Sequence, residues 1–230
     1  MSDTSPLAGY TGRTRLFPLP NLVFFPRVMQ PLHIFEPRYR QMTADALAGD
    51  RLIALVLPRP DWEKDYAGKP AIHSVACIGH ILADHRLEDG RYNILLRGQA
   101  RIRILEELPG EDDKLYRVAR TEILKESPIC HPAQESRWRK TLLRKAPEWF
   151  ADQSDVVEQL RKLLHSDLPI GALCDIIAFA VPLEAELKQR LLEELHVETR
   201  LQRLQDFLDA TPPVIQAAPP RPFPPEFSVN

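Results

Sequence analysis

The histidines and cysteines are the first candidates for chemistry in this sequence, because their side chains bind transition metals. His80 and His85 lie five residues apart in a run predicted to be a strand, so their side chains should point to opposite faces. Cys130 and His131 form one adjacent pair, and no second pair stands at the spacing of a zinc site. We therefore expect no metal ion and no other cofactor.

Phosphate binding and nucleophilic catalysis have motifs of their own. A phosphate-binding loop of the form G-x-x-x-x-G-K-[ST] cradles phosphates with backbone N–H groups. The single Gly-Lys pair, Gly68-Lys69, has Pro70 in the Ser/Thr position and Glu63 in place of the first glycine. No G-x-S-x-G elbow occurs either. We expect a chain that is not an enzyme; a small-molecule enzyme stays open as a third interpretation, which a bound metabolite or a cleft with perturbed pKa values would favour.

Arginines on one predicted strand raise the question of nucleic-acid binding. Arg101 and Arg103 should share one face of that strand, with Arg97 nearby and Arg91 across a hairpin. The alternative is an ordinary solvated face, which the formal net charge of −2 favours. A salt-dependent complex with RNA would distinguish the two.

Aromatic side chains are the candidates for contact with a polypeptide: Phe24, Phe25, Phe35, Trp62 and Tyr66. Large aromatics are usually core residues, which is the alternative for Phe35 in its apolar run. Two adjacent rings in extended chain should not both point inward, so we expect Phe24 or Phe25 to be exposed. Trp62 and Tyr66 lie in a charged loop, residues 58–74, where exposed aromatics are typical hot spots; Trp62 could instead fold back over the neighbouring strands.

Five prolines between residues 16 and 40 determine how that segment can fold: Pro18, Pro20, Pro26, Pro31 and Pro37. Each fixes φ, removes a backbone donor and disfavours helix in the residue before it. The segment therefore cannot be one long helix or a central strand. We expect a stiff, extended apolar path that ends in a helix begun by Pro37.

The hydrophobic period divides the rest of the chain into two halves. Residues 13–125 read mainly as strands, with a buried run at 52–57 and a hairpin at 75–105 whose turn contains Asp89-Gly90. Residues 126–210 change to the helical period, with helices expected over 154–164, 170–180, 184–195 and 197–208. We expect a flexible segment at 1–12 and a disordered, proline-rich tail at 211–230. The fold class is α+β.

Several of these segments also resemble one family, the substrate-binding N-terminal domain of the ATP-dependent Lon proteases. The resemblance begins with Leu16-Phe17-Pro18-Leu19 and Pro31-Leu32-His33-Ile34-Phe35-Glu36-Pro37-Arg38-Tyr39. It continues in the hairpin with Asp89-Gly90-Arg91-Tyr92 and Arg97-Gly98, and in the helices with Lys188-Gln189-Arg190-Leu191-Leu192-Glu193. Ala76 and His196 depart from the family pattern, which often has Gly at the first position and an Asp or Asn helix cap at the second.

The resemblance implies a PUA-like, pseudo-barrel β half followed by a helical bundle. It also implies a non-catalytic module that recognises unfolded polypeptide or a protein partner, since the motifs of the Lon ATPase and Ser–Lys protease modules do not occur here. The alternative is a PUA-like RNA-binding module, because PUA-like folds often bind RNA. Phe24, Phe25, Phe35, Trp62 and Tyr66 are the residues expected to contact the polypeptide.

Composition limits the setting in which the protein works. Residues 1–10 are polar and lack the apolar core of a secretory signal, and no apolar run is long enough to span a membrane. Cys77, Cys130 and Cys174 are odd in number and far apart, which is typical of reduced thiols. We expect a cytoplasmic protein with no membrane partner and no nucleic-acid partner; its oligomeric state stays open.

Overall fold

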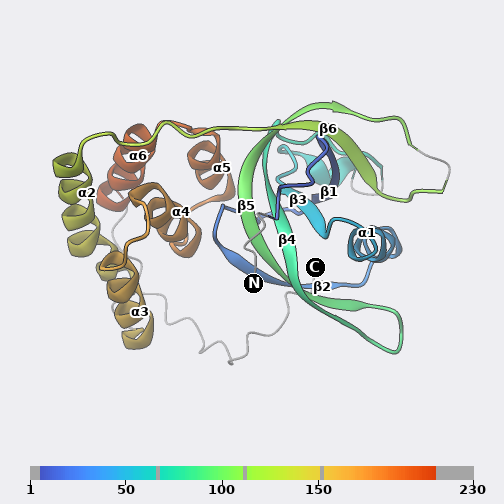
Figure 1. Cartoon of the computed structure of the whole chain (residues 1–230), viewed down its shortest axis with the longest axis horizontal. Helices are drawn as coiled ribbons and strands as arrows, with labels where there is room; N and C mark the ends of the chain where they lie inside the picture. The colour runs from blue at the N-terminus through green and yellow to red at the C-terminus, as the bar shows by residue number, and fades with distance from the viewer. Residues whose placement is uncertain (1–5, 66–67, 111–112, 151–152, 211–230) are drawn as a thin grey trace. The chain divides into compact units, whose positions relative to one another are not determined.

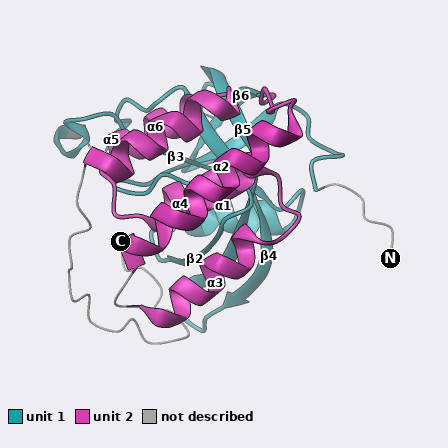
Figure 2. Ribbon diagram, turned by 90° about the vertical axis from the view of Figure 1, so that its left-hand side faces the viewer, with its two compact units in different colours: residues 1–124, 223–230 teal, residues 125–222 magenta. Residues whose placement is uncertain are grey.

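The protein was analysed as a computed structural model, which describes residues 6–65, 68–110, 113–150 and 153–210. The described chain divides into two compact units, with the division between Leu124 and Lys125 (Figure 2). The first unit is rich in strands and the second is helical, so the predicted change of period at the middle of the chain is confirmed. No described helix has the length and apolar character needed to cross a membrane.

The first unit is built on six strands and one helix (Figure 1). The strands are β1 (Arg13–Pro18), β2 (Met29–Ile34), β3 (Leu52–Val56), β4 (Val75–Arg86), β5 (Tyr92–Glu107) and β6 (Arg117–Ile123). The helix α1 (Pro37–Leu47) follows β2, and a short 3-10 helix, η1 (Trp62–Asp65), lies between β3 and β4. Pro37 stands in the first turn of α1, as predicted, because its missing N–H has no partner there in any helix.

The strands close into a ring. Their order is β2-β5-β4-β3-β1-β6, and β6 also pairs with the C-terminal half of β5. Among the described strands, only β1 and β3 run parallel to each other; the other pairs are antiparallel. Alternate residues of the ring strands meet in one hydrophobic cluster: Leu16, Leu52, Ala54, Val56, Ala76, Ile78, Ile102 and Ala119.

Two expectations for the N-terminal part of the chain need correction. Residues 16–18 belong to a strand that lies between two others, because the first proline comes only at the last position of β1. The exclusion of a central strand was therefore wrong for this stretch. The segment expected to be flexible also contains ordered contacts, since Leu7 and Tyr10 pack against the ring's core and the Tyr10 hydroxyl meets Thr121.

The second unit consists of five α-helices and the 3-10 helix η2 (Ala146–Phe150) within its described residues. The helices are α2 (Pro132–Lys145), α3 (Ser154–Leu164), α4 (Ile170–Ala180), α5 (Ala185–Glu193) and α6 (Val197–Ala210). Their apolar stripes face one another, as the spacing predicted, with Leu164, Ile177 and Leu201 fully buried. The change of period predicts helix over residues 126–210 in general, but the bounds of α2 were not predicted.

A buried arginine joins three parts of this helical unit. The Arg200 side chain, on α6, has no solvent exposure and lies 3.2 Å from the Asp175 carboxylate of α4. It also reaches Glu126 at 2.7 Å and donates a hydrogen bond to the Glu194 carbonyl at 2.8 Å. A buried charge needs such partners, because desolvation without them is costly.

Candidate functional site

The first unit contains a cleft with a volume of about 200 Å³. Three elements frame it: the first turn of α1, the loop that precedes β4, and the connection between β5 and β6. We call it the α1 cleft. Its lining residues are Pro18, Arg38, Tyr39, Gly68, Lys69, Glu107, Leu108, Pro109, Gly110, Lys114, Leu115, Tyr116, Arg117 and Val118.

Polar contacts between distant segments hold the walls of the α1 cleft in place. The Arg117 guanidinium donates to both carboxylate oxygens of Glu107 and, at 2.9 Å, to the carbonyl of Pro70. Paired N–H donors that match a carboxylate are among the stronger and more directional hydrogen bonds. Arg117 therefore fixes the loop before β4 against the β5–β6 connection.

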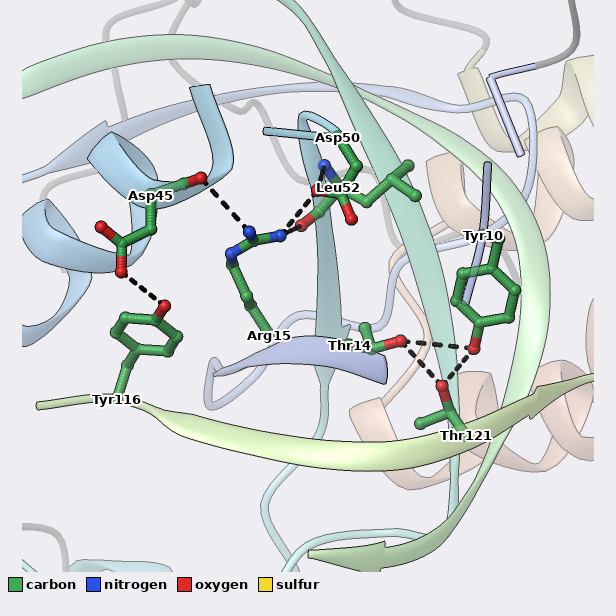
Figure 3. A network of polar contacts seen from close by, with 8 residues as sticks. All are labelled: Tyr10, Thr14, Arg15, Asp45, Asp50, Leu52, Tyr116 and Thr121. Carbon is green, nitrogen blue, oxygen red and sulfur yellow. Dashed lines mark hydrogen bonds and ion pairs between the residues drawn. The ribbon is translucent and has the colours of Figure 1, made fainter. Parts of the chain in front are cut away.

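The opposite wall, α1, is attached to the same connection by Gln41 and Asp45. The Gln41 side chain accepts a hydrogen bond from the Leu115 backbone N–H at 2.8 Å and donates one to the Asp113 carbonyl. The Tyr116 hydroxyl donates to the Asp45 carboxylate at 2.6 Å (Figure 3). Burial and this carboxylate raise the pKa of Tyr116 to about 12, so the phenol keeps its proton and acts as a donor.

Figure 3 also shows that Arg15, on β1, contacts α1 and the residues that follow this helix. The Arg15 guanidinium forms an ion pair with Asp50 at 2.6 Å and donates to the carbonyls of Asp45 and Leu52. Beside it, the hydroxyl groups of Thr14 and Thr121 are 2.7 Å apart, and Tyr10 contacts both. The α1 cleft is thus preformed rather than dependent on a ligand for its shape.

The surface of the α1 cleft is mixed in character. Leu108 and Leu115 supply apolar area, and the Leu115 side chain is unusually open for a leucine, with 63% exposure. The Arg38 guanidinium stacks over the Tyr39 ring at 4.6 Å and pairs with Glu36 at 3.0 Å. Such a surface can hold an apolar side chain while polar groups at the rim contact the backbone on either side.

The described lining holds no nucleophile–base pair built on Ser, Cys or His. It contains no Ser, Cys or His, and its one carboxylate, Glu107, is engaged by Arg117. Elsewhere in the described chain, no group of three or more His, Cys, Asp or Glu residues is placed to hold a metal ion. The pKa values of His80 and Lys188 are lowered, in each case mainly by burial, but the two residues lie in different units.

Phe24 and Phe25, two of the predicted contact residues, are core residues instead. Their exposures are 1% and 0%, so the expectation that one of them points outward is wrong. The reason is that residues 21–28 form no regular strand: Asn21 and Arg27 adopt positive φ, and the chain turns at both. Alternation of side chains applies to a pleated strand and fails on such a path.

The other predicted contact residues are distributed differently. Phe35 is half-buried and stacks on His33, with ring centroids 6.2 Å apart. It lines a small groove beside the α1 cleft, and Tyr39 borders both. Trp62 is half-buried on η1 and lines neither cavity. Tyr66 lies outside the described residues.

The arginines considered for nucleic-acid binding do not form one exposed face. Arg101 is buried, with 1% exposure, which corrects the expectation of a shared surface with Arg103. Arg103 is exposed and pairs with Glu122 at 3.0 Å. Of the three arginines on β5, only Arg97 and Arg103 are exposed, and they lie six positions apart; the fourth, Arg91, is exposed and pairs with Asp89.

Part of the α1 cleft was predictable from the sequence. The loop at 58–74, predicted to face a partner, contributes Gly68 and Lys69. The β5–β6 connection, including Leu115, was not predicted. The only sequence signal there was the turn-forming pair Pro109-Gly110 between two apolar runs.

Comparison with known proteins identifies the family that this chain matches. The family model described as "ATP-dependent protease La (LON) substrate-binding domain" matches residues 13–210. The chain is 25% identical over 207 residues to a Lon protease of Dictyoglomus thermophilum, covering 88% of this chain and 25% of that protein. It is 29% identical over 197 residues to Lon protease 2 of Herpetosiphon aurantiacus, covering 82% of this chain and 23% of that protein. The chain therefore spans about a quarter of the length of these curated relatives.

Two solved structures share the fold. A Lon N-terminal domain protein from Xanthomonas campestris aligns with a TM-score of 0.61 at 20% identity, over 85% of this chain and 98% of that one. The N-terminal domain of a Lon protease from the Mycobacterium avium complex aligns with a TM-score of 0.65 at 19% identity, over 86% and 98% of the two chains. Both similarities extend over most of the ring of strands and the helices that follow it.

Proposed function

This chain belongs to the family of ATP-dependent protease La (LON) substrate-binding domains, and we propose that it is a non-catalytic module that binds polypeptide at the α1 cleft. The ligand is an unfolded segment or an exposed segment of a protein partner. One observation carries the proposal: the α1 cleft combines an exposed Leu115 with a described lining that contains no Ser, Cys or His.

The physical basis is a preformed concave surface. The contacts of Arg117, Gln41 and Tyr116 hold its walls before any ligand arrives, so binding orders few protein side chains. An apolar side chain of the ligand would contact Leu108 and Leu115, and burial of such area drives association. Phe35 would extend the contact into the neighbouring groove.

Three finer assignments are part of the same proposal. The β-rich unit is of the PUA-like, pseudo-barrel type over residues 13–125, and residues 126–210 form a helical bundle. The protein works in the cytoplasm, in keeping with three free cysteines, two of which are buried. RNA binding is not proposed, because the burial of Arg101 and the Arg103–Glu122 pair leave β5 without a basic face.

A matched pair of leucine substitutions tests the proposal. Leu115 and Leu105 are both exposed leucines of the first unit, at 63% and 48%, but only Leu115 lines the α1 cleft. Affinity for a permanently unfolded reporter, such as a reduced and carboxymethylated lactalbumin, is measured by fluorescence anisotropy. We expect Leu115→Ser to weaken binding about tenfold, as at a hot spot, and Leu105→Ser to leave it unchanged. Equal affinities for all three proteins, or no binding by the wild type, would reject the α1 cleft as the site.

A further inference from the structure

The helical unit carries a row of cations on α2 that the proposed function does not use. Arg137, Lys140 and Arg144 are all exposed and occur at intervals of three and four residues, so they lie on one face of the helix. Their charged groups form no hydrogen bond or ion pair with any described residue. We call these three residues the basic stripe.

The other sides of α2 are already occupied. Trp138 and Leu142 face the interior of the unit. Arg139 donates to three carbonyl groups of the α3–α4 connection, those of Leu164, Ser166 and Leu168, at 2.9, 3.0 and 2.7 Å. The basic stripe therefore belongs to a helix whose position is fixed, and it occupies the remaining face.

The stripe differs in charge from its surroundings. The two other cations of α2 each have an acidic partner, in the pairs Lys145–Asp209 and Arg139–Glu135. The stripe presents three positive charges with no such partner on a chain whose formal net charge is −2. Three small side chains, Ala133, Ser136 and Thr141, lie beside the cations and line a shallow groove with them.

We propose that the basic stripe binds an acidic helical segment of a partner protein. Within this chain, α2 already contacts two acidic residues of another helix, α6. Gln134 contacts Glu198, and Lys145 contacts Asp209. The stripe spans about 10.5 Å along the axis, at ~1.5 Å per residue, which matches carboxylates at similar intervals on a facing helix. The small side chains allow that helix to come close.

The small number of cations in the basic stripe favours a helical partner over a nucleic acid. Three cations on one face, on a protein of negative net charge, form a short row rather than the broad basic surface that follows a phosphate backbone. Exposed ion pairs are individually weak and are screened by salt. The contact should therefore give selectivity for acidic segments and a strong dependence on ionic strength.

The test uses the full chain and a synthetic helical probe. The probe is an alanine-based helical peptide with glutamates at i, i+3 and i+7, and its counterpart has glutamine at those positions. The stripe variant is Arg137→Gln/Lys140→Gln/Arg144→Gln. The matched control, Lys125→Gln/Arg161→Gln/Arg190→Gln, removes the same charge from three exposed cations elsewhere in the unit. All these positions are exposed, so folding should be kept, and circular dichroism verifies it.

We expect the wild type and the control to bind the glutamate peptide at low ionic strength and to lose it as salt rises. The stripe variant should bind it at least about tenfold more weakly, and the glutamine peptide should not bind. Equal losses in the stripe and control variants would show a general charge effect and overturn the proposal. Tighter binding of a single-stranded oligonucleotide than of the peptide, through the same three residues, would overturn it as well. The α1 cleft is unchanged in every variant. Binding of the unfolded reporter therefore tests the proposed function separately from binding of the glutamate peptide.

Discussion

The carbonyl oxygen of Phe25 lies directly against Gly98, so that a Cβ added to Gly98 would be 2.1 Å from it. The backbones are joined on either side of this contact, because Arg27 donates to the Gly98 carbonyl at 2.8 Å and Gly98 donates to Val28 at 2.9 Å. The adjacent ring, that of Phe24, lies against Gly79, the cross-strand partner of Gly98. The segment between β1 and β2 thus packs against Gly79 of β4 and Gly98 of β5.

Substitution of Gly98 should therefore destabilise the first unit. The conflict is with backbone atoms, which cannot rotate away, so we expect Gly98→Ala to lower the free energy of unfolding by about 1–3 kcal/mol. Gly110→Ala is the matched control, because a Cβ there meets nothing within 4 Å. Urea denaturation followed by tryptophan fluorescence measures both. Equal urea midpoints for Gly98→Ala and Gly110→Ala would show that the segment between β1 and β2 does not pack against Gly98.

A second prediction concerns the buried pair Arg200–Asp175. Replacing Arg200 with Ala removes the guanidinium that lies 3.2 Å from the buried Asp175 carboxylate, and breaking a buried ion pair in this way costs about 3–5 kcal/mol. Arg190→Ala, on an exposed position of the same unit, should change stability little. Hydrogen exchange of the α4 and α6 amides gives the measurement. Protection that survives in the Arg200 variant would contradict the structural role given to this residue.

The pH dependence of stability should report the environment of Lys188. Burial lowers the pKa of Lys188 from 10.5 to about 8, and its ammonium group donates to the Phe179 carbonyl at 2.6 Å. Between these two pKa values the unfolded chain binds the proton more readily than the folded one, so this contribution to stability rises as pH increases from about 8 to 10.5.

Lys188→Met should remove that dependence. The difference in free energy of unfolding between wild type and variant is measured by denaturant titration at several pH values across the window. The wild type should become more stable relative to the variant as pH rises. A difference that is constant from pH 8 to pH 10.5 would mean that the lysine titrates equally in the folded and unfolded states.

Local patterns of the sequence were sufficient for much of the fold. The helix beginning at Pro37, the buried strand at 52–56 and the hairpin turn at Gly90 all lie where the sequence predicted them. Each depends on a short-range property: a fixed φ, an apolar run, or a residue that adopts positive φ without strain. The helical period after residue 130 is a signal of the same local kind.

The features that failed depend on contacts between distant residues. Burial of Phe24 and Phe25 requires turns at Asn21 and Arg27, neither of which is a glycine, and two glycines far along the chain. Burial of Arg101 is likewise set by packing rather than by strand period. The α1 cleft exists because Arg117 contacts Pro70 and Gln41 contacts Leu115, pairs that are separated by 47 and 74 residues. No local pattern encodes such pairs.

Nuclear magnetic resonance tests the central claim, binding of polypeptide at the α1 cleft, most directly. Backbone amide shifts of the ¹⁵N-labelled full chain are followed while the unfolded reporter is added. Shift changes should concentrate on the residues that line the cleft, with Tyr39, Lys69 and the stretch from Leu115 to Val118 foremost. Changes confined to the helices α2 to α6, or an unchanged spectrum at saturating reporter, would contradict the account.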